Sequence, residues 1–588
     1  MVAPANNIAG AFYFRRLYLI ITFNKIQGKG FLKMSILTDQ LFISPIMKPV
    51  ILFLIASLML TFHVEAQIPA ANDFLKPAFH KGRRDAFRNM MPAHSVAVIF
   101  SAPVKNFAND VDYVFHQNPD LYYLTGYNEP HSVLLLFKEV QTNAQGKSYN
   151  ELFFVQKRDP EQESWTGKRL GVEGVQRNLG IEMVFENSAF NEYKLDFSTF
   201  ENIIYDAPRT DVGNYINDES DLYDLMKQFR TKAAIKDDYD PMIFMNYGII
   251  SQYGSLAPDK VKSYLAERMK TNKNLNEDKL IKAFVNAADT AELKKAIADV
   301  NNVKNPPRDF EKITNSLREI KTPEEMVLLQ KAIDISSVAH AETMKAIRPG
   351  ISERELQGIQ EFVHKKYGSE EVGYPSIVGT GKNGCILHYE SNSDLHSANQ
   401  LVLMDVGAEY HGYTADITRT FPATGKFSKE QLLLYNLVYD AQEAVFKICK
   451  EGTPFGDLQT TSAAVLAKGL KSLGIIADEK DVSLYYPHGV SHHLGLDVHD
   501  KSNYGDLKDG MVITVEPGIY IPEGSKCDKK WWGIGIRIED DVLVEKDKGK
   551  ILSTLVPRKA SEIEKLIEQK SPLENFLLPP LSAPKKGF

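Results

Sequence analysis

The chain has 588 residues, of which 43% are hydrophobic and 25% are charged. This is ordinary globular usage, so a disordered or fibrous protein is excluded. Its 69 Lys and Arg residues against 76 Asp and Glu residues give a net charge of −7, which argues against a nucleic-acid-binding protein, because such proteins normally carry a basic excess. The three cysteines form no C-x-x-C pair, so structural zinc and dithiol redox chemistry are not expected.

A secretory signal is predicted at residues 47–66. A lysine precedes an apolar run at residues 50–62, and a small-residue cleavage sequence ends at Ala66, which is the layout of a signal peptide. The apolar run is shorter than the roughly 20 residues that a membrane-spanning helix needs. We therefore expect a mature chain that is secreted or periplasmic and has no membrane span. Residues 1–46 would then be an upstream extension, with Met47 as the true start.

Residues 71–315 are predicted to form a mixed α/β domain. Apolar runs favour strands at residues 94–101, 132–137 and 151–156. The Lys-, Glu-, Asp- and Ala-rich residues 216–300 are predicted to be solvated helices, and they carry no candidate chemistry.

A second domain of alternating helices and strands is predicted at residues 316–569, followed by a tail at residues 570–588. Its first helix is expected to begin at Thr322-Pro323-Glu324-Glu325. Threonine is a good N-cap, proline suits the first turn, and the glutamates face the positive end of the helix dipole. The chain as a whole is therefore predicted to be an α+β protein.

Two aspartates mark the first candidate site in this domain. Asp405 lies in the apolar run LVLMDVG, and Asp416 follows a turn in the sequence ADITR. If the hairpin is centred between Tyr410 and His411, the two aspartates face each other with side chains about 5 Å apart. Buried carboxylates at that distance repel each other and have raised pKa values, and a divalent cation would remove both problems. For this pair alone, a turn or edge position of one aspartate explains the pattern equally well.

Further acids and a group of histidines follow in the sequence. Glu516 ends the apolar run MVITVE, and Glu539 ends the run GIGIRIE, with Arg537 on the same face of the strand. The stretch PHGVSHHLGLDVHD, which lies between the two aspartates and these two glutamates, holds four of the chain's 14 histidines: His488, His492, His493 and His499. Acids within apolar strands beside these histidines predict a metal site. An oxygen-rich ligand set with one imidazole suits manganese first, with cobalt or zinc as alternatives.

Residues 318–569 resemble the pita-bread metallopeptidases, which include aminopeptidase P, prolidase and methionine aminopeptidase. The motifs LMDVGAEYHGYTADITRTF, HGVSHHLGLDVHD, TVEPGIYI and GIRIEDD stand in the family's order. The resemblance implies two divalent metal ions, with Mn²⁺ expected and Co²⁺ or Zn²⁺ as alternatives. In this family pattern Asp405 would bind one metal, His492 and Glu516 would bind the other, and Asp416 and Glu539 would bridge the two.

The resemblance also implies a set of residues that contact the substrate: His388, His488, His499, Tyr520 and Arg537. Of these, His388 and His499 would also be catalytic, together with Glu516. His493 departs from the family pattern, because aminopeptidases P often carry a large aromatic residue there. It is expected to make the neighbouring wall of the site more polar.

The first domain is similar to the N-terminal domain of aminopeptidase P. The similarity lies in DYVFHQNPDLYYLTGYNEP and continues in RDP and WTG; methionine aminopeptidases lack such a domain. Together the two resemblances imply an exported Xaa-Pro aminopeptidase, which acts on peptides with proline at the second position. A hydroxide held between two metals would attack the bond before the proline. The sequence leaves open whether the chain forms a homo-oligomer.

Two alternatives remain open. A prolidase would use the same metal site on Xaa-Pro dipeptides, and would need a group that captures the free carboxylate of proline. A non-catalytic pita-bread module that binds partners would typically have lost metal ligands, whereas all five ligand positions are filled here.

Overall fold

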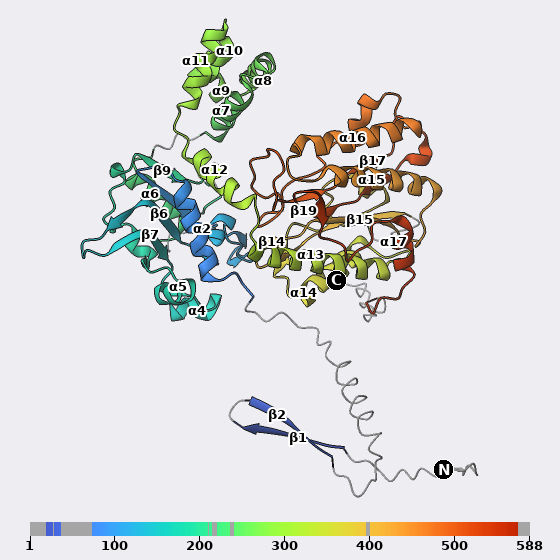
Figure 1. The fold of residues 1–588 in the computed structure, drawn as a ribbon, viewed down its shortest axis with the longest axis horizontal. Helices are drawn as coiled ribbons and strands as arrows, with labels where there is room; N and C mark the ends of the chain where they lie inside the picture. Colours follow the sequence, from blue (N-terminus) through green and yellow to red (C-terminus); the bar gives the residue numbers. More distant parts are fainter. Residues whose placement is uncertain are drawn as a thin grey trace, which may run out of the picture. The chain divides into compact units, whose positions relative to one another are not determined.

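The structure is a computed structural model that describes residues 19–26, 29–36, 73–207, 209, 211–213, 220–235, 240–394 and 400–573 (Figure 1). The predicted signal peptide and residues 574–588 of the predicted tail lie outside the described residues. The chain divides into two compact units, residues 1–70 and 71–588. In the first unit, β1 (Leu19–Ile26) pairs with β2 (Lys29–Ile36). No helix among the described residues is both long and apolar enough to cross a membrane.

A five-stranded sheet forms the centre of the N-terminal domain. Its order is β8-β7-β6-β3-β9, with β3 at Ser95–Phe100, β6 at Val133–Thr142, β7 at Ser148–Val155, β8 at Val184–Glu186 and β9 at Asn202–Tyr205. The three strands predicted from apolar runs are confirmed as β3, β6 and β7. The helices of this domain are α2 (Pro77–Met90), α3 (Pro119–Thr125), α4 (Pro160–Thr166) and α5 (Gly171–Leu179), and a small hairpin joins β4 (Asn106–Ala108) to β5 (Val111–Asp112).

The section predicted to be helical consists of helices in its described parts. These are α6 (Leu222–Lys232), α7 (Pro241–Tyr253), α8 (Pro258–Thr271), α9 (Lys273–Glu277), α10 (Lys279–Asn286) and α11 (Thr290–Asn301). Helices α7 to α11 enclose an apolar core of their own, to which Ile250, Leu265 and Phe284 belong. The next helix, α12 (Pro306–Arg318), spans the predicted domain boundary at residues 315 and 316.

The C-terminal domain begins with α13 (Pro323–Ala346), where Thr322 and Glu325 form a capping box, which confirms the predicted helix start. Figure 1 shows α13 and α14 (Glu353–Lys366) on one side of the strands, and α15 (Lys429–Ile448) and α16 (Phe455–Ser472) on the other. The last helix is α17 (Ala560–Ile567). Short 3-10 helices lie at Asn187–Phe190, Phe197–Thr199, Gly381–Cys385, Glu479–Leu484 and Lys529–Trp531.

Antiparallel strands between these helices carry the candidate site. One three-stranded group is β11 (Ile377–Thr380), β12 (Leu401–Val406) and β15 (Ile417–Pro422), and a second is β10 (Glu371–Val372), β13 (Ala408–Tyr410) and β14 (Tyr413–Thr414). A third is β16 (Val512–Val515), β19 (Asp540–Val544) and β20 (Gly549–Ile551), and β17 (Gly518–Ile521) pairs with β18 (Ile534–Arg537). The described chain thus has the predicted α+β composition.

The register of the β12–β15 hairpin corrects one prediction. Asp405 pairs with Thr418, so Asp405 and Asp416 are not directly opposed. Tyr410 pairs with Tyr413, which leaves His411 and Gly412 as a two-residue turn with φ values of 51° and 85°. Positive φ at both positions is the geometry that tight hairpin turns prefer. The turn therefore lies one residue later than we predicted, and Asp416 stands just before β15.

Candidate metal centre

One cavity of about 450 Å³ gathers the five predicted metal ligands. Asp405 comes from β12 and Asp416 from the residue before β15, while Glu516 directly follows β16 and Glu539 directly precedes β19. His492 lies in the loop after the 3-10 helix Glu479–Leu484. The cavity is also lined by four of the predicted substrate-contacting residues: His388, His488, His499 and Arg537.

Tyr374 joins the two aspartates that the hairpin register holds apart. Its hydroxyl lies 2.6 Å from Oδ1 of Asp405 and 2.6 Å from Oδ1 of Asp416. Burial, followed by the charges of these aspartates, raises the pKa of Tyr374 well above its usual value. Sequence reasoning missed this residue, because a tyrosine in the loop Gly373-Tyr374-Pro375 carries no pattern that distinguishes it from a packing residue.

His492 is oriented so that one ring nitrogen faces the acids. Its Nδ1 lies 3.0 Å from the backbone oxygen of His493, and since a carbonyl only accepts hydrogen bonds, Nδ1 carries the proton. Nε2 then points to Asp416 Oδ2 at 3.3 Å and to Glu516 Oε1 at 3.6 Å. A backbone partner of this kind commonly fixes the tautomer of a metal-binding histidine. Asp416, His492 and Glu539 each offer a ligand atom within 4.8 Å of the others.

The cavity holds more buried negative charge than its cations balance. Burial raises the pKa of Glu516 to about 7 and the pKa of Glu539 well above its usual value. Burial also raises the pKa of Asp405, although the Arg537 guanidinium opposes the shift. Burial alone would raise the pKa of Asp416, but the contact with His492 lowers it below the usual range. Burial would likewise lower the pKa of His492, yet Asp416 and Glu516 raise it to about 9.

These donors fit divalent cations. Four carboxylates and one imidazole nitrogen point into one cavity, and oxygen-rich sets of this kind suit hard or borderline divalent metals. The same cations would compensate the carboxylates that burial otherwise forces toward protonation.

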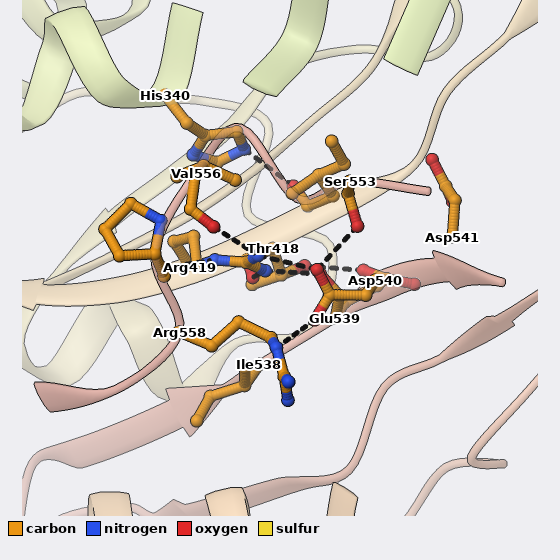
Figure 2. Close-up of polar contacts among 12 residues, drawn as sticks. His340, Thr418, Arg419, Ile538, Glu539, Asp540, Asp541, Ser553, Val556 and Arg558 are labelled. Atoms are coloured by element: carbon orange, nitrogen blue, oxygen red, sulfur yellow. Dashed lines mark hydrogen bonds and ion pairs between the residues drawn. The ribbon is translucent and has the colours of Figure 1, made fainter. Parts of the chain in front are cut away.

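A buried ion pair between Arg419 and Asp540 lies beside Glu539, as Figure 2 shows. Arg419 Nη2 pairs with Asp540 Oδ1 at 2.6 Å, and Nη1 donates to the backbone oxygens of Thr418 and Glu539 at 2.9 and 2.5 Å. Asp540 also accepts a hydrogen bond from Ser553. These contacts fix the backbone of Thr418 and that of the predicted ligand Glu539. Sequence reasoning gave Arg419 and Asp540 no role, although charged residues within ITRT and IEDD were an available signal.

A polar wall beside the ligands consists of Arg537, Tyr520 and His488. Arg537 forms an ion pair with Asp405 and donates from Nη1 to the Tyr520 hydroxyl at 2.8 Å. The Tyr520 hydroxyl lies 2.8 Å from His488 Nε2, and burial lowers the pKa of His488 to about 4. On another side, the exposed His499 has its ring centroid 4.3 Å from that of His492, and partial desolvation, followed by the charge of His492, lowers the pKa of His499. His388 is exposed at the mouth of the cavity.

The structure corrects the expectation for His493. This side chain is fully buried and stacks on Phe455 at 5.5 Å between ring centroids, with Tyr504 edge-on at 5.3 Å. It is not among the residues that line the metal-ligand cavity. Its ring therefore replaces an aromatic packing group and does not make the cavity wall more polar.

Comparisons with known proteins find matches for both domains of the chain. Residues 327–546 match the Metallopeptidase family M24, and residues 80–204 match the Aminopeptidase P, N-terminal domain. The Xaa-Pro aminopeptidase of Escherichia coli is 30% identical over 497 residues, which cover 82% of this chain and 96% of that protein. A solved structure of E. coli aminopeptidase P with the inhibitor Pro-Leu covers 84% of this chain and 98% of its own, with a TM-score of 0.64 and 28% identity. A Zn-substituted E. coli aminopeptidase P in complex with product covers the same shares, with a TM-score of 0.63 and 28% identity.

Proposed function

Because this chain belongs to the aminopeptidase P family of M24 metallopeptidases, we propose that it is an Xaa-Pro aminopeptidase with a dinuclear metal site. It would release the first residue of peptides that have proline at the second position. The observation that carries the proposal is the cavity itself, in which four carboxylates, three of them buried, and His492 face one another beside a wall of Arg537 and His488.

The metals are assigned to the five ligands predicted from the sequence. Asp405 would hold one ion, His492 and Glu516 would hold the other, and Asp416 and Glu539 would contact both. Manganese is the proposed native metal, because carboxylate oxygens dominate the set. Bound there, the ions supply an activated water as nucleophile and polarise the scissile carbonyl.

The protein's own residues handle the proton and the substrate. Glu516, whose Oε1 lies 3.6 Å from His492 Nε2, is placed among the ligands, where it would accept the proton of the attacking water and return it to the leaving nitrogen. His388 and His499 line the cavity and would donate hydrogen bonds to the carbonyl oxygen as negative charge develops on it. The nitrogen of the scissile bond belongs to proline and has no N–H. Recognition must therefore rest on a pocket for the ring, which we assign to the wall of Arg537, Tyr520 and His488.

Two further parts of the proposal concern where the chain acts and how its catalytic domain is classified. We propose export after cleavage behind Ala66, on the signal-peptide pattern of residues 47–66. N-terminal sequencing of protein recovered outside the cytoplasm would test it.

The antiparallel strand groups flanked by α13, α14, α15 and α16 are consistent with the pita-bread architecture.

The activity is tested with two substrates, an Xaa-Pro-Pro tripeptide and an Xaa-Pro dipeptide, each with added Mn²⁺ and with a chelator. We expect the first amino acid to be released from the tripeptide and the reaction to stop on chelation. Cleavage confined to the dipeptide would make the protein a prolidase. If folded, metal-loaded protein cleaved neither substrate, the proposed activity would be wrong.

A further inference from the structure

An ionic cluster, buried except for Asp497 and part of Lys501, joins the N-terminal domain to the loop that carries His492 and His499. Arg318, at the end of α12, has only 2% of its surface exposed. Its Nη1 pairs with Asp120 Oδ1 of α3 at 2.9 Å, and its Nη2 pairs with Asp497 Oδ2 at 2.6 Å and with Asp500. A single guanidinium therefore connects a helix of the N-terminal domain with two acids of the loop that follows His493.

Two lysines complete the cluster and balance its charge. Lys321 Nζ lies 2.9 Å from Asp500 Oδ2, and Lys501 Nζ lies 2.6 Å from Asp120 Oδ2. Three acids thus face three cations, and the positive charges keep the pKa of Asp120 and Asp500 below the usual range despite burial. Buried ion pairs of this geometry resist rearrangement, because breaking one partner leaves an unpaired charge.

The clustered acids flank His499 in the chain. The loop from His492 to Asp500 closes on itself, since the backbone N–H of Asp500 donates to the His493 oxygen at 2.8 Å. Gly495 packs directly on the Asp500 carboxylate, and a Cβ at that position would overlap Asp500 Oδ2. The positions of His492 and His499 in the cavity therefore depend on where Asp497 and Asp500 are held.

We propose that Arg318 and Asp120 are positioning residues for the reaction. Through Asp497 and Asp500 they hold His499 against the cavity, so that the N-terminal domain acts on catalysis without touching the substrate. The inference rests on the proposed function, in which His499 contacts the reacting carbonyl.

The test compares two variants with a control at the same junction. Asp120→Asn removes the charge that Arg318 and Lys501 face. Arg318→Lys keeps the charge but loses the planar fork that reaches Asp120 and the loop acids together. The control is Tyr123→Phe, which removes a hydrogen bond of 2.9 Å from the Tyr123 hydroxyl to the Leu317 backbone oxygen but leaves the ionic cluster intact.

We expect Asp120→Asn and Arg318→Lys to lower kcat on Xaa-Pro-Pro about tenfold, the scale seen when groups that orient a metal-site histidine are removed. KM and bound metal should stay close to the wild-type values, and Tyr123→Phe should keep its full kcat. An unchanged kcat in folded Asp120→Asn protein, or an equal loss in Tyr123→Phe, would overturn the proposal.

A double-mutant cycle separates positioning from a general loss of structure. In a His499→Ala background we expect Asp120→Asn to change kcat by less than about twofold, because the group that it positions is gone. An undiminished tenfold effect in that background would show that the cluster does not act through His499. If the wild-type protein itself released nothing from the tripeptide, the proposed function would fail instead.

Discussion

The metal cavity and the junction cluster around Arg318 are both rich in charge, yet only the junction cluster has enough cations to balance its acids. At the junction, three cations face three acids, and the pKa values of Asp120 and Asp500 are lowered. In the cavity, four carboxylates share Arg537 and His492, and the pKa values of Glu516 and Glu539 are raised. Balanced burial of charge indicates a structural or positioning role, whereas an uncompensated excess of carboxylates indicates a site for an added cation.

The largest loss of turnover is expected when the cavity loses a carboxylate. Asp416→Asn or Glu539→Gln should lower turnover by more than about a hundredfold, because an amide cannot compensate a dication as a carboxylate does. Asp120→Asn is the matched control, since it makes the same chemical change in the balanced cluster and should leave metal content unchanged. Kinetics and metal analysis of the three variants check this. Full activity and metal content in Asp416→Asn would disprove the ligand assignment.

Metal removal should make stability depend on pH in a way that the metal-loaded protein does not show. In the metal-free protein, Glu516 has a folded pKa of about 7 against a usual 4.5, and His492 has about 9 against 6.5. Raised pKa values stabilise the fold at low pH, and this contribution is lost as pH rises through the folded values. Each pKa unit corresponds to about 1.4 kcal/mol.

Thermal unfolding in chelator should therefore show a Tm that falls from pH 5 toward pH 9, a range set by these two groups. Saturating Mn²⁺ should raise the Tm most at the alkaline end, because bound cations replace the lost protons. A Tm that responds equally to Mn²⁺ at all pH values would contradict the excess of negative charge in the cavity.

A smaller effect is expected at the polar wall. His488 touches Tyr520 and is not assigned as a metal ligand, so His488→Ala should leave more activity than Asp416→Asn, with a loss of about tenfold. The loss should appear mainly as a higher KM for proline-containing substrates, because the polar wall binds the proline ring. Steady-state kinetics with bound metal measured on the same sample provide the test; loss of metal from His488→Ala would count against the assignment.

The smallest effect is expected in the helices α7 to α11, which neither family match covers. Leu256 is 79% exposed there, so Leu256→Lys should shift the free energy of unfolding by no more than about 0.5 kcal/mol and leave kcat unchanged. A marked loss of activity would show that this section does contribute to the reaction.

The sequence predicted most of the candidate site because its four acidic ligands lie within or next to apolar strands, where a carboxylate stands out from its neighbours. It also predicted the start of α13, whose Thr322–Glu325 capping box is a local pattern. The centre of the hairpin turn was missed by one residue, so that Asp405 pairs with Thr418 and not with Asp416, since the residues of the turn do not by themselves determine where the strands pair. Tyr374 and the Arg318 cluster were not predicted. Asp120 and Arg318 are 198 positions apart, and only the folded chain brings such residues together.

The most direct test of the central claim is the metal content of the purified protein, measured together with hydrolysis of Xaa-Pro-Pro on the same sample. We predict two divalent ions per chain, loss of both ions and activity on chelation, and recovery of both with Mn²⁺. Undiminished cleavage of the tripeptide by protein shown to be metal-free would contradict the account.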